Sequence, residues 1–307
     1  MGPHKACYGH LAMSYVVSIS DPEHVLSREV LQLMELQEPS WLRELRLLGE
    51  PGASDVFFRG QPINVKTANA DNRQGVEIAI NGNTDDVVAG AVVVRLADIT
   101  EDAVIVHPDV NGEVINDHGG TLHIPNATAA AIAIIGKALG TRIEHITGTV
   151  LEPVSALGPL GIEELYGQTV ALFNQEHIPT ETIGGRLAFN LLPTTTDLAG
   201  LDSLLTSPVS ISTITAPVFG GTMLLLDYWL ENELDIADVT QRLATSPVIR
   251  FDNNVQPALI IDNDEIRLLP PITTGKNVHI IAVIDEIRRN AAALISVVQT
   301  VCDLEAF

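Results

Sequence analysis

Residues 124–140, IPNATAAAIAIIGKALG, form the most clearly patterned stretch of this 307-residue chain. Ala and Ile predominate from Ala127 to Leu139, over a length typical of a helix, and the breaker Gly140 follows. The turn at residues 124–126 leaves the N-terminus of this helix facing whatever lies beyond it. An apolar run of this kind favours packing in a core over contact with a cofactor, so we expect a buried helix.

Strand-like and helix-like segments alternate on both sides of this helix, which is typical of an α/β protein. Before it we expect a strand at 16–20, a helix from 22 to about 36 with Asp21 as N-cap, a helical segment at 40–48, a hairpin at 56–65, and strands at 75–80, 91–95 and 103–107. After it we expect a strand at 142–151, a helix at 161–175, apolar runs at 187–192 and 209–218, a helix at 234–243, strands at 258–261, 266–269 and 278–283, and a closing helix at 286–304.

The charge of the chain limits its partners. It carries 17 Lys and Arg against 39 Asp and Glu, a formal net charge of −22. Nucleic acids and anionic membranes attract clustered basic residues, so we expect neither as a partner. Apolar residues make up 46 % of the chain, which excludes the composition of a disordered acidic protein.

The cysteines and histidines exclude several kinds of site. Cys7 and Cys302 lie near opposite ends, which fits a reducing compartment and rules out a disulfide framework. His118 and His123 lack a third ligand at a suitable spacing, so we expect no metal site. Residues 1–12 lack the apolar segment of a signal peptide and are treated as a leader outside the fold. No apolar run has the length of a membrane span, and we expect a cytoplasmic protein.

Six short segments resemble motifs of the aspartate-semialdehyde dehydrogenase family. They are residues 108–111 (PDVN), 125–128 (PNAT), 154–158 (VSALG) with 163–165 (EEL), 188–193 (AFNLLP), 216–222 (APVFGGT) and 285–294 (DEIRRNAAAL). Each segment is short, and their common order over residues 108–294 carries the resemblance.

The resemblance implies an α/β fold with two domains. A degenerate Rossmann-type domain would comprise residues 13–125 and 284–307, so that the last helix of the chain completes it. A mixed α+β dimerisation domain would comprise residues 126–283. The resemblance also implies a homodimer, with a heterodimer beside an active relative as the other possibility.

The catalytic groups of the family are missing at the matched positions. Enzymes of this family use a cysteine thiolate, a histidine base and a nicotinamide cofactor. Ala127 stands at the position of the nucleophile and Thr222 at that of the base. Only a thiolate is nucleophilic enough for this chemistry, and a methyl group cannot replace it. The resemblance therefore implies that this chain has no catalytic residues of the family type.

The cofactor loop of the family is also degraded. Its positions are occupied by Asp21, Glu23, His24 and Ser27. Residues 18–27 contain no glycine, whereas a dinucleotide loop needs glycines for close approach to the pyrophosphate. Asp21 and Glu23 would place negative charge where phosphates lie, and Glu50 and Glu286 stand at two further cofactor positions. We therefore expect no bound cofactor, although NADP is typical of the family.

Three functions remain open. We favour a non-catalytic relative that acts as a dimerising scaffold or binding subunit. The second is an oxidoreductase on an aldehyde or acyl phosphate, with Thr128 or His123 as displaced catalytic groups. The third is a metabolite sensor that uses the old interdomain cleft. The cleft candidates are Asn126, Thr128, Ser155, Gly158 and Thr222.

Overall fold

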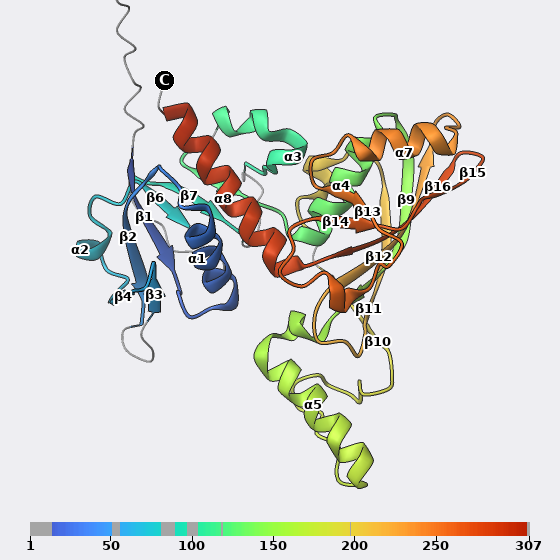
Figure 1. Cartoon of the computed structure of the whole chain (residues 1–307), viewed down its shortest axis with the longest axis horizontal. Helices are drawn as coiled ribbons and strands as arrows, with labels where there is room; N and C mark the ends of the chain where they lie inside the picture. The colour runs from blue at the N-terminus through green and yellow to red at the C-terminus, as the bar shows by residue number, and fades with distance from the viewer. Residues whose placement is uncertain are drawn as a thin grey trace, which may run out of the picture.

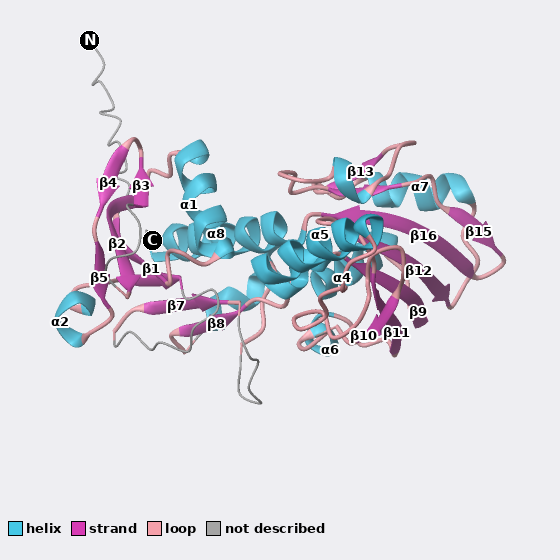
Figure 2. Ribbon diagram, turned by 90° about the horizontal axis from the view of Figure 1, so that it is seen from below, coloured by secondary structure: helices cyan, strands magenta, loops and turns pink. Residues whose placement is uncertain are grey.

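The fold is that of a computed structural model, which describes residues 14–50, 56–80, 90–96, 104–117, 119–196 and 198–305. The leader at 1–12, with Cys7, and His118 lie outside these ranges. Two β-sheets stand side by side, and helix α8 (Glu286–Glu305) runs from one toward the other (Figures 1 and 2). The architecture is α/β, with a parallel Rossmann-like unit and a mixed-sheet unit.

The first sheet is parallel throughout, with strand order β5-β2-β1-β6-β7-β8. Its strands are β1 Tyr15–Ser20, β2 Leu42–Gly49, β5 Val65–Thr67, β6 Ile78–Ile80, β7 Val92–Arg95 and β8 Thr121–His123. Every residue of β1, β6 and β7 is buried, as expected of strands that are covered on both faces. The smaller elements of this half are the hairpin β3 Val56–Phe58 and β4 Gln61–Ile63, α2 Ala70–Arg73, α3 Pro108–Asn111 and a 3₁₀ helix Gly112–Asp117.

Two helices from opposite ends of the chain pack together on this sheet. They are α1 (Val25–Gln37) and α8 (Figure 1). Their common core includes Val30 and Met34 of α1, Leu294 of α8 and Ile19 of β1. The apolar face of α1 therefore depends on residues that follow it in sequence by more than two hundred positions.

The second sheet is mixed and has eight strands, in the order β10-β11-β9-β12-β16-β14-β13, with β15 paired to β16. Its strands are β9 Ile143–Glu152, β10 Leu192–Thr194, β11 Val209–Thr215, β12 Thr222–Leu230, β13 Ile249–Phe251, β14 Ile266–Leu268, β15 Ile272–Thr274 and β16 Asn277–Ile284. Helices α4 Ala127–Leu139, α6 Leu201–Leu204 and α7 Ile236–Ala244 pack together beside it, and α5 Gly158–Asn174 projects away from both sheets (Figure 1).

Helix α4 is the centre of the second core. The side chain of Asn126 accepts a hydrogen bond from the Ala129 N–H at 2.8 Å and so caps its N-terminus. The fully buried Tyr228 hydroxyl of β12 donates to the Ile132 carbonyl at 2.9 Å, which fixes the helix on the sheet. The predicted buried helix at residues 127–139 is confirmed at both ends.

The start of α8 is anchored to segments of both halves. Arg289 is 5 % exposed, and its guanidinium donates to the Asp264 carbonyl, which precedes β14. The same guanidinium lies 3.8 Å from the carboxylate of Asp109 in α3. Burial without pairing would be costly for this charge, so these two partners fix how α8 enters its sheet.

Two expectations near the first helix are wrong. The segment at 40–48 forms strand β2, because it pairs in parallel with β1 from Leu42 to Leu48 and buries Leu47. That pairing outweighs the helix propensity of its Leu, Arg and Glu residues. Asp21 is not the N-cap of α1, since the helix begins at Val25 and the His24 side chain accepts the Leu26 N–H.

Other differences lie in the second half of the chain. The segment at 258–261 is not a strand, because Pro257 begins a 3₁₀ helix that runs to Leu259. The run at 187–192 contains turns and a bend, and only Leu192 belongs to a strand. Strand β12 was not expected, although it is the longest strand that pairs with β9 and with β16. Around residue 105 only an isolated bridge between Ile105 and His123 forms. The domain limits stay a prediction.

None of the helices in the described parts of the chain combines the length and apolar character that crossing a bilayer requires.

Replacement of Leu294 by Ala should destabilise the protein strongly. Leu294 is 0 % exposed between α8 and the first sheet, so the lost packing should lower the free energy of unfolding by about 2–5 kcal/mol. Leu304→Ala, in the same helix but 40 % exposed, should cost less than about 0.5 kcal/mol. Urea unfolding followed by circular dichroism measures both; equal losses would show that α8 does not anchor this core.

Candidate functional site

A cleft of about 670 Å³ opens where elements of the two halves meet. The start of α1 and the start of α8 line it from the first half. The end of β9, the start of α5, and the turns at 194–196 and 220–222 line it from the second half. Residues that lie far apart in sequence therefore share one concave surface, which is where small-molecule sites usually form.

Six of the residues proposed from sequence meet in this cleft. His24, Asn126, Ser155, Gly158, Thr222 and Glu286 all line it. Gly158 has a φ of +75°, a backbone conformation that suits glycine at the turn into α5.

Other proposed residues lie elsewhere. Thr128 is 0 % exposed, and its hydroxyl has no hydrogen-bond partner within the described residues. Ser27 is buried and its hydroxyl donates to the Ser20 carbonyl at 2.9 Å. Asp21 and Glu23 are exposed in the turn before α1, and neither belongs to the lining of the cleft.

The N-terminus of α4 presents a methyl group. Ala127 is the first residue of the helix and is 2 % exposed, beside the capping Asn126. Within the described residues the free thiol is that of Cys302, which is buried in α8 against the first sheet. No cysteine thiol of the described residues is therefore available at the end of α4.

Two carboxyl groups in the cleft have raised pKa values. Burial and the nearby charge of Glu286 raise the pKa of Glu152 from 4.5 to about 7. Burial is also the main cause that raises the pKa of Glu286, whose carboxylate accepts a hydrogen bond from the Thr222 hydroxyl at 3.4 Å. Thr222 is thus already engaged with an acid, and a hydroxyl in this setting is no base.

The remaining charges of the cleft are largely paired with protein groups. Arg288 Nη1 donates to Glu29 Oε1 at 2.5 Å. The Asp285 carboxylate accepts the backbone N–H of Asp262 at 2.9 Å and that of Arg288 at 3.1 Å. These bonds engage Glu29, Asp285 and Arg288 with protein groups, whereas no basic group pairs with Glu152 or Glu286 within the described residues.

The residues present do not fit a dinucleotide. The Leu26 N–H at the start of α1 is bonded to His24 Nδ1 at 3.2 Å, so the helix end is closed by a protein side chain. At the end of β2, a Cβ on Gly49 would lie 3.1 Å from Pro22 Cδ, so the turn before α1 packs closely against that strand. The carboxylates nearby would repel a pyrophosphate.

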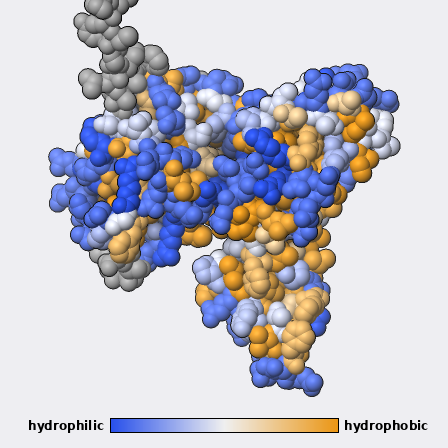
Figure 3. Space-filling view, viewed as in Figure 1, coloured by the Kyte–Doolittle hydropathy of each residue, from blue (hydrophilic) through white to orange (hydrophobic). Residues whose placement is uncertain are grey.

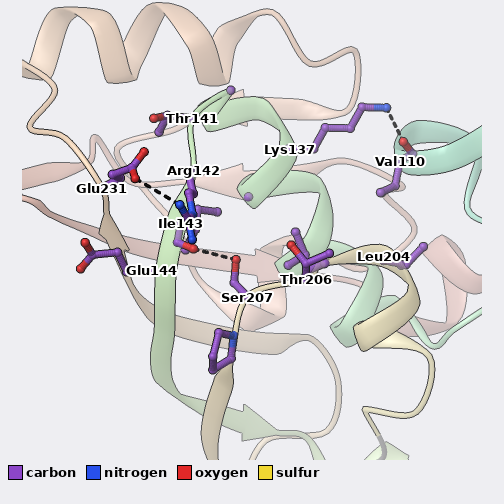
Figure 4. A pocket seen from close by; sticks show the side chains of 14 residues that line it. Val110, Lys137, Thr141, Arg142, Ile143, Glu144, Leu204, Thr206, Ser207 and Glu231 are labelled. Carbon is purple, nitrogen blue, oxygen red and sulfur yellow. Dashed lines mark hydrogen bonds and ion pairs between the residues drawn. The ribbon is translucent and has the colours of Figure 1, made fainter.

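A larger hollow of about 900 Å³ lies at the other end of α4 and contains none of the proposed residues. Its charged groups are occupied within the protein, as Figure 4 shows. Lys137 donates to the Val110 carbonyl at 2.5 Å, and Arg142 pairs with Glu231 at 3.3 Å. Ser207 donates to the Ile143 carbonyl at 2.9 Å. We therefore place the candidate site in the smaller cleft.

Sequence reasoning missed Glu152 and Asn290. Both line the cleft; Glu152 precedes the motif at 154–158, and Asn290 lies within the motif at 285–294 but had no expected role. Glu152 follows an apolar strand directly, and a charged residue at a strand end is a usable signal. Among the described residues no group of three His, Cys, Asp or Glu is arranged to hold a metal ion.

No protein-family model matches the chain. The aspartate-semialdehyde dehydrogenase of Bacillus subtilis is 29 % identical over 161 residues, which is 45 % of this chain and 46 % of that protein. That of Vibrio mimicus is 36 % identical over 98 residues, 30 % of each chain. The chain thus spans less than half the length of these two relatives. A protein of Azotobacter vinelandii described as a USG-1 protein homolog is 27 % identical over 241 residues, 66 % of this chain and 70 % of that one.

Solved structures match over nearly the whole chain. Aspartate semialdehyde dehydrogenase II of Vibrio cholerae, complexed with ASA, has a TM-score of 0.87 at 20 % identity and covers 95 % of this chain and 99 % of its own. A probable aspartate-semialdehyde dehydrogenase of Pseudomonas aeruginosa has a TM-score of 0.84 at 20 % identity, covering 94 % and 98 %. The chain is homologous to this family in sequence and shares its fold.

Glu152→Gln should make stability less dependent on pH. The pKa of Glu152 rises from 4.5 to about 7 on folding, so the folded state holds its proton more tightly. Below pH 4.5 this favours the folded state fully, and the benefit is lost as pH rises through about 7. The glutamine variant should therefore gain stability relative to the parent at pH 8 more than at pH 5.

Thermal unfolding at several pH values measures this effect. Glu144→Gln, at the opposite end of β9, controls for the loss of one negative charge. A gain in stability for Glu152→Gln that is the same at pH 5 and pH 8 would contradict the raised pKa of Glu152 in the folded protein.

Proposed function

We propose that this protein is a non-catalytic relative of aspartate-semialdehyde dehydrogenase that acts by binding, as a dimerising scaffold or binding subunit. The observation that carries the proposal is the methyl group of Ala127 at the N-terminus of α4. In the family pattern this position holds the thiol that attacks the substrate.

The chemistry of the neighbouring residues supports the proposal. Covalent catalysis on an aldehyde needs a nucleophile and a base within hydrogen-bond reach. The Thr128 hydroxyl next to Ala127 is fully buried. Thr222, at the position of the base, donates to Glu286 at 3.4 Å. No pair of nucleophile and base is thus assembled at the end of α4 by the groups proposed for it.

Helix α5 supports a role in association, because it buries polar side chains on its inward side and exposes large apolar side chains on its outward side. Its inward side chains include Gln168, which is 0 % exposed and bonds the Leu187 N–H at 2.7 Å and the Gly185 carbonyl at 2.9 Å. The buried Glu164 accepts the Thr182 N–H at 2.6 Å. Polar residues therefore face the protein, where their hydrogen bonds compensate the cost of burial.

The outward side of α5 is apolar. Ile162, Tyr166, Val170 and Phe173 are 37, 65, 38 and 76 % exposed and recur at helical spacing. Phe189, 70 % exposed, packs edge-on against Phe173 with ring centroids 5.9 Å apart. Figure 3 shows hydrophobic residues gathered on this projecting arm. A continuous exposed patch of this kind marks an interaction surface, and we propose that a second copy of the chain covers it, with a heterodimer as the alternative.

The second candidate function is ligand binding in the cleft, as in a metabolite sensor. The observation that favours it is the cavity of about 670 Å³ that gathers the proposed polar residues. The catalytic alternative has less support, since Thr128 and His123 are both buried and neither lines the cleft.

The proposal predicts no dehydrogenase activity. With aspartate semialdehyde, phosphate and NADP, the protein should form no NADPH above a protein-free blank, because the residue at the N-terminus of α4 is an alanine without a thiol to form the covalent intermediate. A calorimetric titration with NADP up to millimolar concentration should give no saturable heat. Turnover that is lost in Thr128→Ala but kept in Thr300→Ala, at the far end of α8, would refute the proposal.

The proposal also predicts a dimer that depends on α5. Sedimentation velocity should show a dimer for the parent chain and a monomer for the variant Tyr166→Glu/Phe173→Glu, because charge on this patch opposes its burial. Phe57→Glu, an equally conspicuous exposed aromatic at 59 % on the β3–β4 hairpin, should remain dimeric. A monomeric parent, or a double variant that still dimerises, would count against the interface.

A further inference from the structure

The cleft contains a buried hydrogen-bond acceptor without a donor. Asn290 lies on the first turns of α8, is 8 % exposed and lines the cleft, and its Oδ1 has no partner within the described residues. Leaving a buried amide oxygen unpaired is energetically unfavourable. The side chain is therefore poised for a group that carries N–H or O–H.

Carboxylates dominate the same cavity. Its lining holds five of them against one guanidinium: Glu29, Glu152, Asp262, Asp285 and Glu286 against Arg288. The single guanidinium is neutralised by Glu29, and both of these side chains are largely buried, at 12 and 14 % exposure. The cleft consequently keeps an excess of negative charge.

Of these carboxylates, only Glu29 has a basic partner within the described residues, and Glu152 and Glu286 are among those without one. No donor within the described residues bonds the carboxylate of Glu152, and Glu286 accepts only the neutral Thr222 hydroxyl. Burial and the charge of Glu286 raise the pKa of Glu152, and burial and the charge of Asp285 raise the pKa of Glu286. A positive group placed between Glu152 and Glu286 would relieve this repulsion and replace their lost hydration.

We infer that the cleft binds a small aliphatic amine, with its ammonium between the carboxylates of Glu152 and Glu286 and a further N–H donated to Asn290 Oδ1. The inference goes beyond the proposed scaffold role, gives a ligand class to the second candidate function, and does not depend on dimer formation. A divalent metal fits less well, because the described residues offer no group of three ligands at metal-binding spacing. An anion fits less well because of the excess of carboxylates.

Calorimetric titration of the full chain with putrescine tests the inference. Putrescine should bind saturably at pH 7.5, whereas 1,4-butanediol and succinate, its neutral and anionic counterparts, should not. Glu286→Gln should weaken putrescine binding about tenfold or more, and Asn290→Leu by about fivefold, as expected for the loss of charged and neutral hydrogen bonds. Glu144→Gln, on β9 but outside this cleft, should bind like the parent.

The number of protons released on putrescine binding is a second measurement, and it would not change with pH if Glu152 had only a structural role. The other titratable or charged groups that face the cleft are Glu286, Asp285 and Arg288 of α8, His24 and Glu29 at α1, and Asp262 before β14. A bound cation favours the ionised form of Glu152, whose pKa is about 7, so binding at pH 7 should release protons. At pH 8.5 the carboxylate is already ionised and the release should fade.

The results of these titrations either support or overturn the inference. Saturable putrescine binding that weakens in Glu286→Gln and releases protons at pH 7 supports the inference. Absence of binding, equal binding of butanediol or succinate, or equal affinity of a folded Glu286→Gln variant would overturn it. None of these results bears on turnover or on oligomeric state, so the proposed function is tested separately.

Discussion

The burial of α8 against α1 and the parallel sheet is the contact on which the rest of the molecule depends. The helix completes the first core through Leu294 and its neighbours. Its opening turns carry Glu286, Arg288 and Asn290 into the cleft. Arg289 is held by Asp109 and Asp264, which belong to different halves. The same helix therefore sets both the packing of one sheet and the position of the charged groups in the site.

Part of the net charge of −22 is concentrated in the cleft. Much of it lies on the surface, but five carboxylates converge on one cavity with a single guanidinium that is already paired. A site of this sign selects against pyrophosphates through simple Coulomb repulsion. The methyl group of Ala127 and the sign of the cleft are thus two separate observations that support the proposed non-catalytic role.

The sequence predicts an element correctly where its local pattern agrees with the way that element packs in the fold. Helix α4 was predicted at both ends because its apolar run is bounded by a capping turn and a glycine, and several cleft residues followed from motif positions. Strand β2 was missed because Leu, Arg and Glu favour a helix locally, whereas pairing with β1 decides the outcome. Asn290 and Glu152 were missed because their importance comes from unpaired burial and from the nearby charge of Glu286, which only the folded arrangement creates.

The place of α8 in the chain also bears on how the protein is made. Strands β1, β6 and β7 are synthesised early, yet the helix that helps to cover them is separated from the end of β7 by 190 residues. At about 5–20 residues per second, the exposed sheet waits for roughly 10–40 s before its cover emerges. Strands β9, β11 and β12 of the second sheet are synthesised in that interval, whereas β16 directly precedes α8. Nascent chains should therefore leave one face of an apolar parallel sheet open to chaperones until α8 has been made.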